Sequence, residues 1–191
     1  MAVDNAKAVS MPKENIDRAI KRGTGEGGDA SRIEEVVYEA YGPNGVAMLI
    51  ECLTDNRNRT IAEIKSIMNK AGGSIAGAGS VAYQFNKVGE ITIDGQKNSL
   101  KGEDLELAII ESGAEDFDSE DGFYVVRTGF SNLHAVKKAL EDAGVVTDSA
   151  EVVQVATTPV ELPEDKAESV NSMIERLEEL DDVTSVYTNL A

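Results

Sequence analysis

The feature that most restricts the fold is a buried-strand pattern followed at once by an amphipathic helix pattern. The apolar run GVAMLIECLT (45–54) is typical of a buried strand. In IAEIKSIMNKA (61–71) apolar residues recur at helical spacing, and Thr60 with Glu63 fits a capping box. The glycine pair that follows supplies the stop. A buried strand followed by a helix with one apolar face predicts a sheet covered by helices.

Strand and helix patterns alternate along the rest of the chain. IEEVVYEAYGP (33–43) predicts a strand before the buried run, and VAYQF (81–85) with GEITIDG (89–95) predicts a hairpin. Two helix-then-strand patterns occupy 103–157, and one more closes the chain at 163–190. This mixture predicts an α+β fold in which helices cover one face of each antiparallel sheet.

The final helix and strand lack partners of their own, and they would complete the first sheet if the preceding segment were an insertion. At the N-terminus, Pro12 opens a short helix, and GTGEGGDAS (23–31) reads as a linker. We therefore predict a helical remnant with its linker followed by two α+β sandwich domains, the second inserted into the first. The expected boundaries are 1–31 for the remnant, 32–95 plus 157–191 for the discontinuous domain, and 96–156 for the inserted domain.

Charge is distributed unevenly along this chain of formal net charge -17. Residues 1–32 carry six basic and five acidic residues, whereas residues 96–191 carry seven basic and 22 acidic ones. No apolar run approaches the roughly 18 residues of a membrane span, and the N-terminus has no signal or transit pattern. We expect a cytoplasmic protein without a membrane partner.

Residues with catalytic or metal-binding chemistry are few. The single cysteine, Cys52, lies in the apolar run and is expected to be a buried, inert thiol. The single histidine, His134, lies outside the apolar stripe of its helix and has no motif around it. GAEDFDSEDG (113–122) lacks calcium-loop spacing and reads as a solvated acidic turn. We expect no enzyme activity, cofactor, metal or small-molecule substrate.

The stretch TDNRNRT (54–60) places two arginines before the predicted helix. Arg57 and Arg59, with Lys65 and Lys70 on the exposed helix face, would form a basic rim suited to phosphate. The alternative is local pairing of these arginines with Asp55 and Glu63. The following GGSIAGAGS (72–80) lacks a phosphate-loop lysine, so we predict a mobile contact loop there.

Three sequence blocks carry a resemblance to a known family. They are MPKENIDRAIKRGTG (11–25), YEAYGPNGVAMLIECLTDNRNRT (38–60) and IKSIMNKAGGSIAGAGSVAYQF (64–85), and the tail DDVTSVYTNL (181–190) agrees with them. They resemble the signature blocks of the YebC/PmpR family, whose members are described as DNA-binding transcriptional regulators. Mitochondrial relatives activate translation of cytochrome oxidase, and bacterial members are linked to the ribosome.

The resemblance implies a helical N-terminal domain plus two α+β domains, the second inserted in the first. Family members usually begin with a longer, strongly basic segment, so we expect this chain to be a truncated form. The resemblance also implies nucleic-acid contacts. The implied basic contacts are Arg57, Arg59, Lys65, Lys70, Lys13, Arg18, Lys21 and Arg22, and the contact loop is Gly72, Gly73, Ser74, Gly77 and Gly79.

The sequence therefore predicts a nucleic-acid-binding regulatory protein, with transcriptional regulation through DNA preferred. One alternative is a ribosome-associated translation factor that contacts ribosomal RNA. A second alternative is a protein-interaction module whose acidic half, with Glu175, Glu178 and Glu179, binds a basic partner. The choice between DNA and ribosomal RNA, the target and the oligomeric state stay open.

Overall fold

The computed structural model describes residue 3, residues 6–7 and 9–24, and residues 33–191. The helix expected near the N-terminus is α2 (Lys13–Thr24), with Ile16 buried on its apolar side. Most of the expected linker 23–31 lies outside the described residues. No helix of the described residues is both long and apolar enough to cross a membrane.

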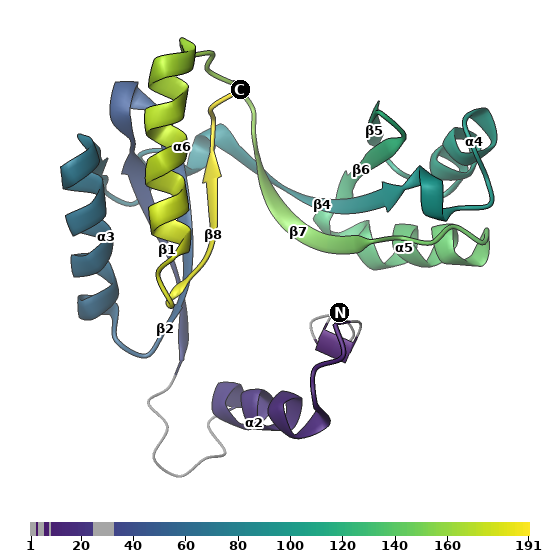
Figure 1. The fold of residues 1–191 in the computed structure, drawn as a ribbon, viewed down its shortest axis with the longest axis horizontal. Coiled ribbons are helices and arrows are strands. Elements are labelled where there is room, and N and C mark those ends of the chain that lie inside the picture. The colour runs from purple at the N-terminus through teal and green to yellow at the C-terminus, as the bar shows by residue number, and fades with distance from the viewer. Residues whose placement is uncertain (1–2, 4–5, 8, 25–32) are drawn as a thin grey trace. The chain divides into compact units, whose positions relative to one another are not determined.

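The described residues form two compact units, each with its own sheet (Figure 1). The discontinuous unit comprises Met11–Asn86 and Val155–Ala191. The inserted unit comprises Lys87–Gln154 with the described residues of Met1–Ser10. Residues 87–95 thus fall in the inserted unit, whereas the sequence analysis assigns them to the discontinuous domain. The reason is that β4 (Phe85–Asp94) pairs with β6 (Phe123–Gly129) from Val88 to Asp94.

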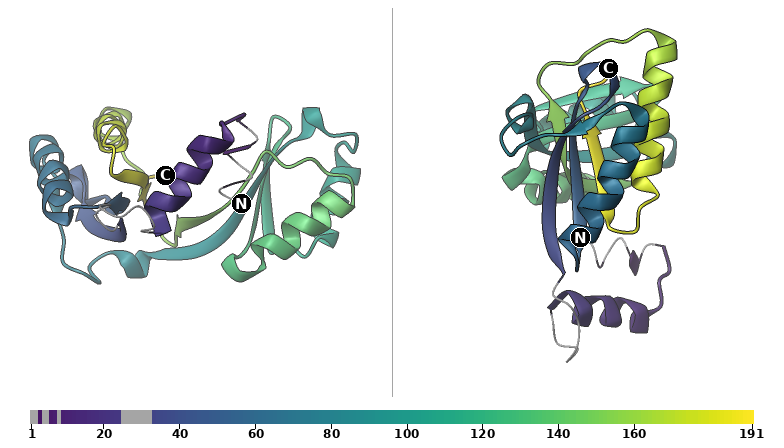
Figure 2. Two further views of the ribbon diagram at one scale, coloured as in Figure 1. Left: turned by 90° about the horizontal axis from the view of Figure 1, so that it is seen from below. Right: turned by 90° about the vertical axis from the view of Figure 1, so that its left-hand side faces the viewer.

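In the discontinuous unit, a four-stranded sheet is covered on one face by two helices. Its strand order is β3-β1-β2-β8. Both views of Figure 2 place the two helices, α3 and α6, on the same side of these strands. The elements are β1 (Glu34–Tyr41), β2 (Ala47–Thr54), α3 (Arg57–Ala71), β3 (Ser74–Ile75), α6 (Glu164–Glu178) and β8 (Val183–Thr188).

The two faces of this sheet have separate cores. Under the helices, Met48 and Ile50 of β2 pack with Ile64 of α3 and Leu177 of α6, and all four are buried. On the opposite face a smaller core forms from Ala47, Leu49, Val81 and Phe85. Alternation along β2 explains this division, because successive side chains of a strand point to opposite faces. The apolar residues 47–50 are thus all buried because the first half of β2 is covered on both faces.

The inserted unit has the βαββαβ arrangement of ferredoxin-like domains. Its strand order is β5-β6-β4-β7, and both helices pack into one core with the strands. This core includes Ile91 and Ile93 of β4 and Tyr124 and Val126 of β6. The remaining elements are α4 (Glu103–Glu111), β5 (Asp116–Glu120), α5 (Leu133–Asp142) and β7 (Ser149–Ala156).

Two sequence predictions of local structure are wrong. The predicted hairpin 81–85/89–95 is instead a 3-10 turn (Ala82–Gln84) followed by the single strand β4, because Gly89 continues the ladder opposite Thr128. A Cβ at Gly89 would lie 2.8 Å from Leu133 Cβ, so this glycine permits close packing rather than a turn. The predicted acidic turn 113–122 contains β5, whose carboxylates alternate with Phe117 in the core.

Candidate nucleic-acid interface

The N-cap of helix α3 lies four residues earlier than the sequence analysis predicts. Asn56 is the N-cap, and its Oδ1 accepts a hydrogen bond from Arg59 N at 3.2 Å. Asparagine is among the best N-cap residues, and this start leaves Thr60 free to be buried inside the first turns. Arg57 and Arg59 therefore belong to the first turn of the helix, and the Thr60–Glu63 capping box predicted from the sequence is wrong.

Arg59 is bound to two carboxylates. Its Nη2 donates to Asp182 Oδ1 and Oδ2 at 2.9 and 2.8 Å, and to Asp55 Oδ1 at 3.1 Å. The Asp55 pair is the local alternative that the sequence offers, but Asp182 lies 123 residues away in the sequence. Arg59 thus ties the start of α3 to the turn before β8.

Asp182 is the centre of a small polar network. Its side chain is 12% exposed, and its Oδ2 lies 2.7 Å from Thr60 Oγ1 and 3.1 Å from Thr54 Oγ1. Burial raises the pKa of this carboxyl, but hydrogen bonds from Arg59, Thr60 and Thr54 outweigh it and the pKa is lowered overall. Thr54 and Thr60, the two ends of TDNRNRT, thus bind a residue that is far away in the sequence, Asp182.

Arg57 is less confined than Arg59. Its Nη2 lies 2.6 Å from Glu34 Oε2 on β1, and its side chain is 61% exposed. Exposed pairs of this kind contribute little stability and exchange readily with other partners. The local pairing expected from the sequence is therefore present at Arg59, with Asp55, whereas Arg57 pairs with Glu34 of a neighbouring strand. No ion pair of Glu63 is found among the described residues.

Lys65 and Lys70 lie on the exposed side of α3. Within the described part of the chain neither lysine has an acidic partner. At about 100° per residue, Lys65 flanks one edge of the exposed face, whereas Lys70 and Arg59 flank the other. The strip between them carries the short side chains Asn58, Ala62, Ser66 and Asn69. The cations thus border a shallow helical surface instead of a single rim.

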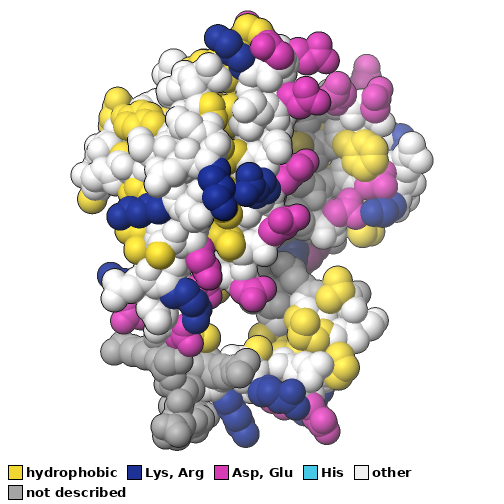
Figure 3. Space-filling model, turned by 60° about the vertical axis from the view of Figure 1, so that its left-hand side comes forward, with side chains coloured by type: hydrophobic (Ala, Val, Ile, Leu, Met, Phe, Trp, Pro, Cys, Tyr) yellow, Lys and Arg dark blue, Asp and Glu magenta, His cyan; other side chains and the backbone are white. Residues whose placement is uncertain are grey.

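Other cations of the sequence-predicted set lie on α2. Lys13, Arg18 and Lys21 are exposed there, and Lys21 has an interaction of its own. The side chain of Arg22 lies outside the described residues. In Figure 3, dark blue Lys and Arg side chains gather near the middle of the face drawn, with magenta carboxylates beside them.

The glycine-rich segment 72–80 is tied down by one carboxylate. Glu39 of β1 accepts hydrogen bonds from Gly79 N at 2.5 Å, Val81 N at 2.7 Å and Ala82 N at 2.9 Å. Burial raises the pKa of Glu39, but these backbone donors outweigh it and the pKa is lowered overall. Tyr41 also donates to Ser80 O at 3.0 Å. The amides of Gly79, Val81 and Ala82 are therefore occupied by the protein itself.

The segment 72–80 runs from the end of α3, where Ile75 packs in the core under the helices, towards the opposite face of the sheet. Val81 and Phe85, which follow the segment, pack in the core on the far side of the sheet from α3. At its start, Gly72 ends α3 with φ 82°, and a Cβ at Gly73 would lie 2.8 Å from Tyr41 O. Gly77 and Gly79 are both exposed. The structure thus separates Gly77 and Gly79 from the basic residues of α3.

The family model described as TACO1/YebC second and third domain matches residues 33–190. The chain belongs to the TACO1/YebC family. It is 44% identical over 190 residues to a probable transcriptional regulatory protein of Caldanaerobacter subterraneus subsp. tengcongensis, and the match covers 100% of this chain and 77% of that relative. A probable transcriptional regulatory protein of Roseiflexus castenholzii is 47% identical over 193 residues, with coverages of 100% and 75%.

A solved structure is similar to this YebC-family chain over its whole length. The crystal structure of a conserved hypothetical protein from Aquifex aeolicus superimposes with a TM-score of 0.90 at 38% identity. The match covers 100% of this chain and 77% of the other. The similarity agrees with the α+β fold that both the alternating patterns and the family resemblance predict.

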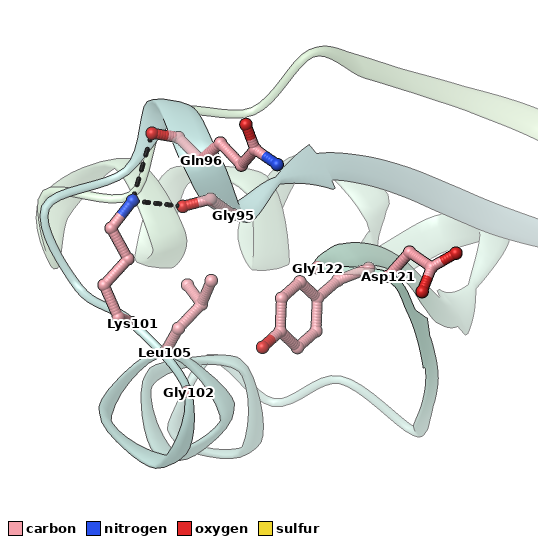
Figure 4. A pocket seen from close by; sticks show the side chains of 8 residues that line it. Gly95, Gln96, Lys101, Gly102, Leu105, Asp121 and Gly122 are labelled. Carbon is pink, nitrogen blue, oxygen red and sulfur yellow. Dashed lines mark hydrogen bonds between the residues drawn. The ribbon is translucent and has the colours of Figure 1, made fainter.

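Three further features of this YebC-family chain bear on its chemistry. Cys52 is buried, and burial raises its thiol pKa to about 11, so a reactive thiolate is not formed at neutral pH. His134 is exposed on α5. A hollow in the inserted unit (Figure 4) has Lys101 in its wall, but Lys101 Nζ donates to the carbonyl oxygens of Gly95 and Gln96 at 2.7 and 3.0 Å. The ammonium group of Lys101 therefore stabilises the loop that forms the wall of the hollow.

Sequence reasoning misses three residues that shape the candidate interface. Asp182 and Glu39 look like ordinary surface acids in the sequence, and only the folded chain places hydrogen-bond donors around them. Tyr83 falls in a predicted strand but lies in the turn before β4, with 75% of its surface exposed. A large aromatic side chain this exposed, on a segment held by Glu39, is a candidate contact residue.

Proposed function

We propose that this chain is a nucleic-acid-binding regulatory protein that contacts phosphates through the exposed face of α3. The regulatory role is supported by the relatives, which are named probable transcriptional regulatory proteins. The observation that carries the nucleic-acid proposal is the pair of exposed lysines, Lys65 and Lys70, without acidic partners among the described residues. Transcriptional regulation through DNA is the preferred form of this role.

Arg57, Lys65 and Lys70 are spread along the 15 residues of α3, a length of about 20 Å. Over that length duplex DNA presents roughly six phosphates on each strand. Short side chains between the cations let a phosphodiester backbone approach the helix closely. Arg59 supports the helix start and, held by Asp182, contributes less to contact. Binding of this kind is mainly electrostatic and reads little sequence.

We predict that Lys65→Glu/Lys70→Glu weakens binding to a 20-base-pair duplex at least about tenfold at low salt. The slope of log affinity against log salt should fall by about 2, because each phosphate contact contributes roughly one unit. Fluorescence anisotropy at several salt concentrations measures both quantities. Lys138→Glu/Lys166→Glu, at exposed lysines of α5 and α6, is the control with the same change of net charge and should change neither quantity beyond that effect. Equal losses in both variants would refute a phosphate contact on α3.

The second candidate function is translational regulation on the ribosome. It is favoured by the make-up of α3, whose cations are isolated and not accompanied by a set of long base-reading side chains. The same variants distinguish the two candidates in a ribosome-pelleting assay. If Lys65→Glu/Lys70→Glu loses ribosomes while duplex binding is weak in the unmodified chain, the translational form is correct. If the variant loses duplex DNA instead, the transcriptional form stands.

A further inference from the structure

Among residues 87–154, both helices pack on one face of the sheet of the inserted unit, and neither covers the other face. Ile91, Ile93, Tyr124 and Val126 face the core with α4 and α5, so their neighbours along β4 and β6 face the other way. We define the acidic sheet face by the side chains on that side. They are Glu90, Thr92 and Asp94 of β4, Asp116, Asp118 and Glu120 of β5, Phe123, Val125 and Arg127 of β6, and Ser149 and Glu151 of β7.

Carboxylates dominate this face. It carries six acidic side chains, and the cation in its middle is Arg127, paired with Asp118 at 2.6 Å and with Glu90 at 3.5 Å. At one end, Lys97 pairs with Asp94 and Asp148. In the described part of the chain Glu120 and Glu151 have no basic partner. The face therefore keeps a negative excess after its own ion pairs are formed.

An exposed aromatic ring stands between two of these carboxylates. Phe123 is 55% exposed, and it is in register with Asp94 on one neighbouring strand and Glu120 on the other. Val125, the next outward residue of β6, is partly exposed and lies opposite Asp118 and Thr92. Arginine and lysine side chains combine a cation with an apolar stem, so they match a ring flanked by carboxylates.

The same topology supports nucleic-acid binding in other proteins, where aromatic side chains on the open face of the sheet stack with bases. In this chain the carboxylates around Phe123 repel phosphates, so this face is unsuited to that ligand. Charge complementarity instead favours a positively charged partner. We propose that the acidic sheet face is a docking surface for an arginine- and lysine-rich polypeptide segment, with Phe123 contacting a basic side chain.

This proposal is independent of the nucleic-acid contact on α3, because it uses the other unit and a ligand of the opposite charge. A fluorescently labelled deca-arginine peptide is the probe, and its binding to the full chain is measured by anisotropy at low salt. Glu120→Lys/Glu151→Lys should weaken binding at least about tenfold, since it removes two attractions and adds two repulsions. Phe123→Ser should weaken it several-fold with the net charge unchanged.

The matched control is Glu175→Lys/Glu178→Lys on α6, which makes the same change of net charge elsewhere. An equal loss in this control would mean that the peptide senses only the net charge of the chain, and the proposal would be overturned. Unchanged binding in both Glu120→Lys/Glu151→Lys and Phe123→Ser would overturn it as well. Because a variant can fail to fold, NMR shift mapping on the unmodified chain is the second measurement. Peptide-induced shifts should concentrate at 116–127, and shifts concentrated on α6 would contradict the proposal.

Discussion

Asp182→Asn is expected to lower the free energy of unfolding by about 2–4 kcal/mol, the range for losing hydrogen bonds to a buried charged group. Asp182 accepts from Arg59, Thr60 and Thr54, and all three partners are donors. An asparagine offers one acceptor oxygen, so its amide nitrogen must face either the guanidinium or the hydroxyl groups. If the nitrogen faces the guanidinium, donors of Arg59 are left unpaired. If it faces the hydroxyl groups, these can accept from it while Thr60 donates to Asn56 O, and what is lost is the charge of the carboxylate opposite Arg59.

Urea denaturation followed by circular dichroism measures the change. Asp181→Asn is the matched control, because Asp181 precedes Asp182 and is exposed. The control should stay within about 0.5 kcal/mol of the unmodified chain. If the two variants were equally stable, the network around Asp182 would not hold β8 to α3, and Arg59 would not anchor the start of the helix.

Glu39→Gln is expected to destabilise the discontinuous unit by about 1–3 kcal/mol and to loosen the segment 76–82. The carboxylate of Glu39 accepts from the backbone amides of Gly79, Val81 and Ala82. In glutamine one of the two oxygens becomes an NH2 group that points at N–H donors. Glu35→Gln is the control, since Glu35 lies on the same face of β1 and is exposed.

The pH dependence gives this prediction a second readout. The pKa of Glu39 is lowered in the folded chain from its ordinary value of 4.5, so the unfolded chain binds the proton more readily. The stabilisation by Glu39 is therefore complete above pH 4.5 and is lost as the pH falls through the folded pKa. The stability gap between Glu39→Gln and the unmodified chain should be widest at about pH 7 and should narrow progressively as the pH falls below 4.5. Hydrogen exchange at Val81 N provides a local check, and a gap independent of pH would contradict the role of the carboxylate.

Sequence periodicity is sufficient to predict the helices and strands whose apolar pattern is regular over many residues. The apolar run of β2 and the stripe of Ile64 and Met68 on α3 predict a sheet covered by a helix, as the structure has it. The start of α3 is misplaced by the sequence pattern because Thr60 is a good cap in isolation. Only in the folded chain does Asp182 bind the hydroxyl group of Thr60, so that Asn56 acts as the N-cap instead.

Features of the candidate site that depend on residues far apart in the chain cannot be predicted from the sequence. The glycines of 72–80 predict mobility when read alone, because a chain rich in glycine has many conformations. Glu39, 40 residues before Gly79, binds the backbone amides at the end of this segment, and nothing in the spacing of the two indicates it. The acidic segment 113–122 is misread as a turn for a related reason: the strand β5 forms only because β6 pairs with it.

The way in which the inserted unit is joined to the rest has a consequence for how the chain folds. Thr157 donates through its N and Oγ1 to Gln84 O at 2.8 and 3.0 Å. These two residues flank the inserted unit, so the chain leaves and re-enters the discontinuous unit at one hydrogen-bonded pair. Between them lie 72 residues, which without structure would form a long loop that costs chain entropy to close. A prefolded inserted unit brings its ends together on the neighbouring strands β4 and β7 and removes most of that entropy. Early folding of the insertion would therefore speed the docking of α6 and β8 onto a sheet begun more than 100 residues earlier.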